Sequence, residues 1–396
     1  MKFLYVSCLC SESKYRELFK NAKIKPGQQV QKYHRLLSEG LIANGVPVKV
    51  LSALPITRTI SKDIFINEDN EEVNKIYYKY IPIINIPVAK NILIFIYSFI
   101  YTMIECCKER KNVVICDVLN ISVSAGALLA AKILNRNSIG IVTDLPIYLS
   151  NKKNLKVKIN DSFINMFKSY IFLTDEMNKV INKKNKPYTV IEGQVDIKMA
   201  NLENNIKDKY EKKICMYTGG LQKIYGIKYL VEGFIRAKID NSELHIFGSG
   251  DYEDELIEIC RQEKNIKYFG VAMNNYVVKE QIKATLLINP RPTEEEYTKY
   301  SFPSKNMEYM VSGTPTLTTK LPGMPKEYND YVYLIDEVSA KGIEESLKSI
   351  LSYSKEVLHY KGIMAKKFVL EEKNNIVQTR KILDMIQKGE IYESRR

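Results

Sequence analysis

The sequence predicts an α/β fold with two Rossmann-like, doubly wound domains that face each other across a cleft. Three observations support this. The chain has 396 residues, which is enough for two or three domains with their own cores. In each half, apolar strand-like runs alternate with helical stretches, a pattern typical of βαβ units and parallel sheets. A polar stretch at 197–212, with few apolar residues, separates the halves and indicates a linker.

The composition limits the class of protein. Hydrophobic residues make up 45% and charged residues 27%, which excludes wholesale disorder, collagen and a coiled coil. The net charge of +13 is confined to one half: residues 1–190 hold 28 basic and 15 acidic side chains, whereas residues 191–396 hold 31 of each. A basic half suits nucleic acid, anionic lipid or an anionic substrate, although a lysine-rich surface without a partner remains open. Its basic clusters lack interleaved aromatic residues, so nucleic acid is not expected.

The first half, residues 1–196, is predicted to form an N-terminal Rossmann-like domain. Strands are expected at 2–8, 47–53, 76–82, 113–119, 138–144, 169–175 and 188–192. Helices are expected near 29–44, 92–108, 121–134 and 160–168. The apolar run at 91–107 is shorter than the about 20 residues needed to span a membrane, and Glu105 interrupts it. It is therefore either a buried helix or a helix with one face on lipid.

The second half, residues 197–370, is predicted to form a second Rossmann-like domain, followed by a C-terminal helix at 371–396 that packs back on the first domain. Strands are expected at 213–218, 243–247, 266–269, 284–288, 315–318 and 331–335. Helices are expected near 226–238, 252–263, 275–282, 304–312, 342–353 and through 355–390. Carboxyl ends of parallel strands are where such domains bind ligands.

Metal and targeting signals are weak. Seven cysteines and three histidines show no metal-ligand spacing, so no metal site is expected and reduced core thiols are favoured. His34 lies in the middle of a predicted helix and is interpreted as a half-exposed structural histidine. The N-terminal apolar run is too short for a signal peptide and is expected to be the first strand.

The most informative segment is 288–316. A strand ends near Asn289, and Ser-Phe-Pro-Ser-Lys at 301–305 then opens a helix, with Pro303 in the first turn. The unpaired N–H groups of that turn, at 304–306, together with the helix dipole, form an anion site. A phosphate bound at the start of the helix would place a ribose about one turn further along. Glu308 lies four residues after Ser304 on the same face of the helix, so its carboxylate can accept hydrogen bonds from two ribose hydroxyls. A capped surface helix with a solvated Glu308 is the alternative.

The segment FPSKNMEYMVSGTP resembles the donor-site helix of glycosyltransferase family 4, whose members are retaining enzymes of the GT-B fold. Other stretches agree in order and spacing, notably MYTGGL at 216–221, YGIKYL at 225–230, LHIFGSGD at 244–251 and KYFGV at 267–271. Stretches of the first half, including VTDLP at 142–146 and IEGQVD at 191–196, look like the polysaccharide-assembling branch.

The resemblance implies a bacterial enzyme that moves a sugar from a UDP- or GDP-sugar to a glycan or lipid-linked glycan, with retention, in capsular polysaccharide, exopolysaccharide or O-antigen synthesis. It implies that residues 1–196 bind the acceptor and that residues 197–370 bind the nucleotide-sugar. The donor-binding residues it implies are Gly219, Gly220, Gly270, Ser301, Ser304, Lys305 and Glu308. The catalytic candidates are Lys305, Arg291, Lys223 and Asp144. The nucleotide-sugar is a substrate, so no cofactor is expected, and side-chain cations are expected to neutralise the diphosphate without a metal.

This sequence departs from the family pattern at three positions. The first glutamate of the family's paired glutamates falls on Tyr300, and Gly220 and Tyr225 stand where the phosphate loop carries arginine and lysine. Lys223 and Arg291 are the candidate replacements. We interpret the chain as a variant with another donor-binding geometry, with a catalytically dead relative as the alternative.

Asp144 ends a predicted strand and precedes a proline, so it could orient or deprotonate the acceptor hydroxyl, or simply cap a turn. A lipid-diphosphate acceptor would suit the basic half, which predicts peripheral contact with an anionic membrane at the cytoplasmic face. Two alternatives remain open: a GT-B nucleotide-sugar epimerase, and a non-catalytic basic protein that binds membrane or nucleic acid.

Overall fold

The structure, a computed structural model, describes residues 1–20, 28–145 and 155–394. The chain divides into two compact units. The first unit comprises Met1–Gln194 together with Asn375–Arg396, and the second comprises Val195–Asn374. The chain thus crosses from one unit to the other near residue 194 and back near residue 374, four residues later than the predicted boundary at 370.

The first unit is built on an eight-stranded sheet in the order β10-β9-β8-β7-β1-β2-β5-β4. Its strands are β1 (Lys2–Ser7), β2 (Val48–Ser52), β4 (Glu71–Val73), β5 (Ile76–Tyr80), β7 (Asn112–Asp117), β8 (Asn137–Val142), β9 (Ser169–Phe172) and β10 (Tyr188–Val190). All neighbours pair in parallel except β4 and β5. The buried apolar residues of the central strands give these strands the near-continuous hydrophobic sequence of a sheet covered on both faces.

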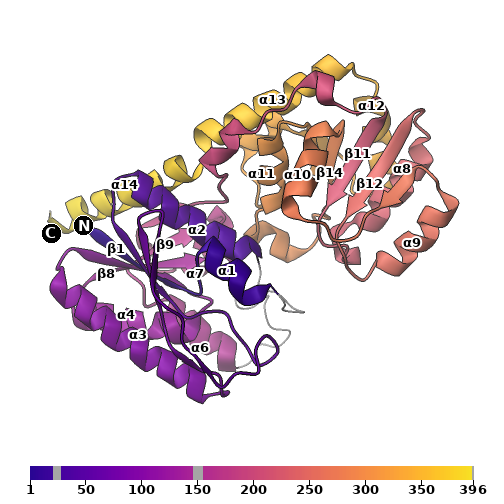
Figure 1. Cartoon of the computed structure of the whole chain (residues 1–396). Coiled ribbons are helices and arrows are strands. Elements are labelled where there is room, and N and C mark those ends of the chain that lie inside the picture. Colours follow the sequence, from indigo (N-terminus) through magenta and orange to yellow (C-terminus); the bar gives the residue numbers. More distant parts are fainter. Residues whose placement is uncertain (21–27, 146–154, 395–396) are drawn as a thin grey trace. The chain divides into compact units, whose positions relative to one another are not determined.

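Helices cover the first sheet, and the C-terminal helix is one of them (Figure 1). The helices are α1 (Glu12–Phe19), α2 (Gln28–Ala43), α3 (Ala89–Lys108), α4 (Ile121–Ile133), α6 (Leu155–Ile164), α7 (Asp175–Ile181) and α14 (Asn375–Ser394). The amide of Asn44, just after α2, donates to the carbonyl of Ile376 at 2.8 Å and to the hydroxyl of Thr379 at 2.9 Å. These bonds hold α14 against α2.

The second unit has a six-stranded, wholly parallel sheet in the order β13-β12-β11-β14-β15-β16. Its strands are β11 (Lys213–Thr218), β12 (Ser242–Phe247), β13 (Ile266–Tyr268), β14 (Leu286–Asn289), β15 (Thr316–Thr319) and β16 (Tyr333–Ile335). Its helices are α8 (Ile227–Ala237), α9 (Glu253–Gln262), α10 (Asn274–Lys283), α11 (Ser304–Ser312), α12 (Ala340–Ile350) and α13 (Lys355–Glu372). The predicted fold class of two Rossmann-like α/β units is confirmed.

Side-chain alternation along β11 divides the core of the second unit into two layers. Cys215 and Tyr217 pack with α8, α9 and α12, whereas Ile214 and Met216 pack with α10 and α11. Successive residues of a strand point to opposite faces of the sheet, so one apolar strand serves both layers.

The stretch 197–212 is not the free linker that its polar sequence predicts. It forms two short 3₁₀ turns, Ile197–Asn201 and Ile206–Asp208, and packs on the second unit. The ammonium of Lys209 donates to the carbonyls of Ile282 at 2.7 Å and Ala284 at 3.0 Å and to the hydroxyl of Thr314 at 2.8 Å. Burial lowers the pKa of Lys209 to about 7, whereas the three acceptors favour its charged form.

Replacing Lys209 with methionine should lower the free energy of unfolding by about 1–3 kcal/mol, because carbonyl groups at the end of α10 lose a buried donor. Urea denaturation measures this loss. The exposed Lys207, two residues earlier, is the matched control, and its change to methionine should have little effect. Equal stability of the two variants would contradict the structural role of Lys209.

Candidate functional site

The loops that follow β11 and β12 touch each other through glycine backbone. Gly219 and Gly248 have φ angles of +151° and +133°, which side chains other than glycine rarely adopt. A Cβ atom placed on Gly248 would overlap the carbonyl oxygen of Gly219. The hydroxyl of Tyr217 donates to the carbonyl of Gly220 at 2.7 Å, which fixes the next peptide of the same loop.

Lys305 lies across this glycine loop. A Cβ atom placed on Gly219 would overlap Cε of Lys305 and lie 2.7 Å from its Nζ. Lys305 is the second residue of α11, which begins at Ser304 after Pro303, and no side chain caps the helix start. The structure therefore brings together two predicted elements, the loop at 219–220 and the first turn of α11, and sets a cation between them.

Buried polar contacts hold α11 at the carboxyl ends of the strands. The amide of Asn289, at the end of β14, donates to Asn306 at 2.8 Å, and Asn306 donates to Thr318 of β15 at 3.2 Å. The hydroxyl of Tyr309 accepts from the backbone N–H of Thr218 at 2.9 Å. The sequence analysis gave these side chains no role, although a polar residue at the end of an apolar strand was a usable signal. Its expectation of an unpaired N–H group at residue 306 was wrong, because the N–H of Asn306 donates to the carbonyl of Pro303 at 2.9 Å.

Arg291 follows β14 and is held by aromatic rings. Its guanidinium carbon lies 5.8 Å from the ring centre of Tyr225 and 5.3 Å from that of Tyr297. Its carbonyl accepts from the hydroxyl of Thr319 at 2.6 Å. Its Nε is buried and has no hydrogen-bond partner among the described residues. Tyr225, which stands where the family carries lysine, thus provides a surface for a neighbouring cation.

The charge of Lys223 is balanced by a carboxylate of α9. Its backbone N–H donates to Asp251 at 2.7 Å, and its ammonium lies 3.1 Å from the carboxylate of Glu255 on α9. This ion pair directs the Lys223 side chain toward α9. A role for it at the diphosphate stays a prediction.

The remaining donor-site candidates lie on the same unit. Ser304 is exposed at the start of α11, and Glu308 is half-buried one turn later. The hydroxyl of Ser301 is buried without a hydrogen-bond partner in the described chain. Gly270 follows β13 with a φ of +67°, and no atom lies within 4 Å of the place where a Cβ would stand. Its carbonyl accepts a hydrogen bond from the N–H of Gly248 at 2.8 Å. Tyr300 is half-buried just before them.

Two residues of the first unit, Asp144 and His34, were singled out from the sequence. Asp144 is exposed on the loop after β8, next to residues 146–154, which lie outside the described part of the chain. His34 is only 2% exposed, so the expectation of a half-exposed histidine was wrong. Its side chain projects from α2 onto the sheet, with Nδ1 2.6 Å from the hydroxyl of Tyr5 and Nε2 3.1 Å from the carboxylate of Asp117. This burial supports the predicted structural role.

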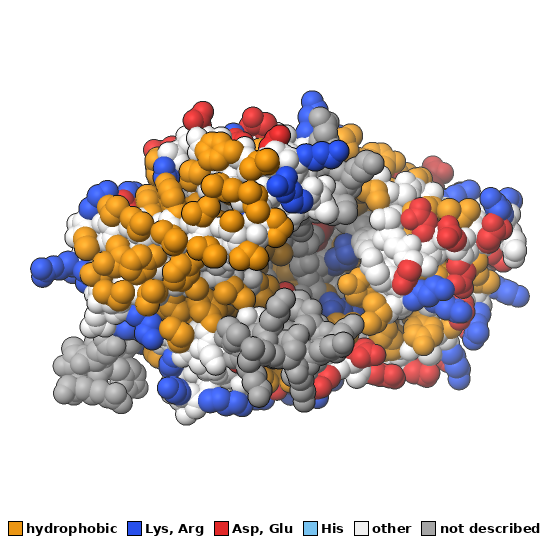
Figure 2. Space-filling view, turned by 90° about the horizontal axis from the view of Figure 1, so that it is seen from below, with side chains coloured by type: hydrophobic (Ala, Val, Ile, Leu, Met, Phe, Trp, Pro, Cys, Tyr) orange, Lys and Arg blue, Asp and Glu red, His pale blue; other side chains and the backbone are white. Residues whose placement is uncertain are grey.

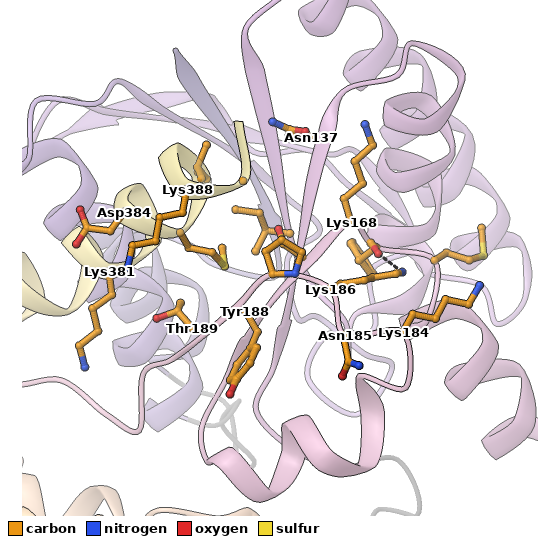
Figure 3. Close-up of a pocket in the computed structure, with 18 residues that line it drawn as sticks. Asn137, Lys168, Lys184, Asn185, Lys186, Tyr188, Thr189, Lys381, Asp384 and Lys388 are labelled. Atoms are coloured by element: carbon orange, nitrogen blue, oxygen red, sulfur yellow. Dashed lines mark hydrogen bonds between the residues drawn. The ribbon is translucent and has the colours of Figure 1, made fainter. Parts of the chain in front are cut away.

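A cavity of about 1050 Å³ lies where the sequence predicted no site (Figure 3). It opens at the amino ends of β8, β9 and β10, beside α14, whereas Asp144 follows the carboxyl end of β8. Its apolar lining includes Ile139, Pro187 and Ile386. Its lining includes the five lysines Lys168, Lys184, Lys186, Lys381 and Lys388.

Comparison with known proteins supports the fold of the whole chain and identifies a glycosyltransferase family match in the second unit. Residues 200–367 match the family model "Glycosyl transferases group 1". A search of curated protein sequences gave no match.

Solved structures cover nearly the whole chain. Sucrose-phosphate synthase from Thermosynechococcus elongatus aligns with a TM-score of 0.65 at 14% identity over 100% of this chain and 99% of its own. HepE from Anabaena, in complex with UDP, aligns with a TM-score of 0.65 at 11% identity over 98% and 100%. A TarM variant from S. aureus, in complex with UDP, aligns with a TM-score of 0.64 at 12% identity over 97% and 99%. At this identity the structures establish a shared GT-B fold.

Replacing Tyr309 with phenylalanine tests whether α11 depends on its buried contact. The change removes the hydroxyl that pairs with Thr218, and it should lower the free energy of unfolding by about 1–3 kcal/mol. Urea denaturation measures the loss. Tyr353, which is 47% exposed in the same unit, is the control, and its change to phenylalanine should be nearly neutral. Similar losses in the two variants would contradict the assignment.

Proposed function

We propose that this chain is a retaining glycosyltransferase of family 4 type that moves a sugar from a nucleotide-sugar to a glycan or lipid-linked glycan acceptor. The observation that supports it best is the position of Lys305 over Gly219, at the first turn of α11. A glycine loop, the positive end of the α11 dipole and a cation together suit a diphosphate.

The donor is proposed to be a UDP- or GDP-sugar. HepE has been solved with UDP, with UDP and glucose, and with UDP-glucose, which favours a UDP-sugar over a GDP-sugar as the donor. On this chain, Lys305 and the positive end of the α11 dipole would bind the diphosphate. Glu308, one turn along α11, would accept hydrogen bonds from the ribose hydroxyls.

The chemistry requires stabilisation of the leaving diphosphate. Negative charge grows on the diphosphate as its bond to the sugar breaks, while an acceptor hydroxyl attacks the anomeric carbon. Lys305 and Arg291 are held in place before the reaction, by the α11 contacts and by the Tyr225 and Tyr297 rings. Pre-positioned cations stabilise the growing charge without reorganisation. We propose that they do so without a metal.

The acceptor is proposed to bind the basic first unit, as part of bacterial capsular polysaccharide, exopolysaccharide or O-antigen synthesis. Asp144 is the candidate for orienting or deprotonating the acceptor hydroxyl, because it is exposed at the carboxyl end of β8.

Replacing Lys305 with alanine should lower turnover by about 100-fold or more, because a charge contact to the leaving group is lost. Stability should change little, since the residue is only half-buried. Donor hydrolysis across a panel of UDP- and GDP-sugars measures turnover, and urea denaturation measures stability.

Lys341→Ala, on the exposed side of α12, is the control for loss of one positive charge. Equal turnover of Lys305→Ala and the unchanged protein would refute the role of Lys305. Running each assay with and without EDTA tests whether turnover needs a metal ion, and loss of turnover in EDTA would contradict a metal-free reaction. Recovery of an epimerised donor in place of free nucleotide would favour an epimerase.

Replacing Glu308 with alanine should weaken UDP binding by about 10-fold or more, since the ribose hydroxyls lose a charged acceptor. Isothermal titration calorimetry with UDP and with GDP measures this and identifies the base. Glu345→Ala, an exposed position on α12, is the control. Binding of any polyanion, sensitive to salt and unaffected by Glu308→Ala, would instead favour a non-catalytic basic protein.

A further inference from the structure

One side of α3 exposes a row of large apolar side chains. Ile92, Ile96, Ile100 and Ile104 follow at four-residue intervals and are 45–54% exposed. Residues four apart lie on one side of a helix, so these form a row along α3. Leu129 and Ile133 of α4, which packs beside α3, widen it. We name these six side chains the apolar face, and Figure 2 shows hydrophobic side chains gathered on this side of the first unit.

The opposite side of α3 is fixed to the fold. Ile94, Ser98 and Thr102 are buried, and the hydroxyl of Ser98 donates to the carbonyl of Val123 on α4 at 2.6 Å. By length and composition α3 could cross a membrane, but its packing against α4 and its buried Glu105 are features of a helix that belongs to a folded core. A helix with one packed side and one apolar exposed side suits the plane of a bilayer surface.

Basic side chains surround the end of the apolar face. Lys108, Arg110 and Lys111 lie at and just after the end of α3, and all three are exposed, whereas the one acid among them, Glu109, is half-buried. Exposed Lys132 lies on the last turn of α4. The acidic Glu105 is paired with Lys49 at 2.7 Å and with Lys108 at 3.0 Å, so it adds no unbalanced negative charge.

The lysine-lined cavity of Figure 3 continues this basic region. The ammonium of Lys168, on its lining, donates to Asn135, just after α4, at 2.8 Å. Lys186 has a pKa lowered by burial and then by the like charges of Lys184 and Lys132. Among the residues that the structure describes, five lysines and one acid, Asp384, line this cavity. The apolar face therefore ends beside a concentration of positive charge.

We propose that the apolar face docks on an anionic phospholipid bilayer, with α3 and α4 lying at the headgroup level and the neighbouring basic groups against lipid phosphates. Charge selects this partner: apolar side chains enter the acyl boundary, while lysines meet anionic headgroups. A second copy of the chain would bring two basic surfaces together, which repel. The proposal does not depend on the proposed transferase activity.

The chain has no tryptophan, so one introduced tryptophan reports on its own surroundings. Ile100→Trp should show blue-shifted emission, and quenching by brominated acyl chains, when vesicles of phosphatidylcholine with phosphatidylglycerol are added. The control is Val357→Trp on α13, because Ile100 and Val357 are each 51% exposed. Val357→Trp should show neither the blue shift nor the quenching. Equal response of the two variants, or none in Ile100→Trp, would overturn the proposal.

The double variant Ile96→Lys/Ile100→Lys should lower co-sedimentation with the same vesicles by about tenfold or more, since two apolar contacts are lost. Val357→Lys is its control, and urea denaturation of both variants verifies that the fold is intact. Vesicles of phosphatidylcholine alone should bind less, and equal binding would refute the role of charge. A dimer that Ile96→Lys/Ile100→Lys converts to monomer, in a protein that ignores vesicles, would assign the face to a second copy.

Discussion

The contact of α11 with the carboxyl ends of β11, β14 and β15 is the constraint on which the candidate site depends. A helix of nine residues does not hold its position through its own hydrogen bonds. Here Tyr309, Asn306 and Asn289 attach it to three strands through bonds that are out of water. Because such bonds are costly to leave unmade, the first turn of α11 stays beside the glycine loop. Lys305 is positioned as a consequence.

The two units separate two kinds of chemistry. The second half of the sequence has no net charge, and its cations are placed individually, as Arg291 is by two tyrosine rings. The first half carries the whole excess of positive charge and also an exposed apolar row on α3. A diffuse field attracts an extended anionic surface, whereas a single placed cation stabilises one developing charge. This division agrees with a donor site in one unit and a docking surface in the other.

Most of the fold could be predicted from the sequence, because long apolar runs alternate with helical patterns. All thirteen predicted strands are present, with ends shifted by a few residues. The antiparallel pair β3 (Phe65–Ile66) and β6 (Ile83–Ile84), together with β4, was missed, since two or three residues show no periodicity. Helices α1 and α7 were missed for a similar reason. The stretch 197–212 was mistaken for a linker because polarity alone does not show that Lys209 finds three buried acceptors.

By itself, the sequence determined the α/β class, the two-unit division, the glycine loop at 219–220 and a helix start at Ser304, because these follow from local periodicity and from residues with special backbone preferences. Only the tertiary structure decided that Lys305 crosses Gly219, that Arg291 lies close to two aromatic rings, that Lys223 pairs with Glu255 and that His34 is buried. Each of these is a contact between distant segments, and side chains of the same type are paired, stacked or buried according to which neighbours the fold brings to them.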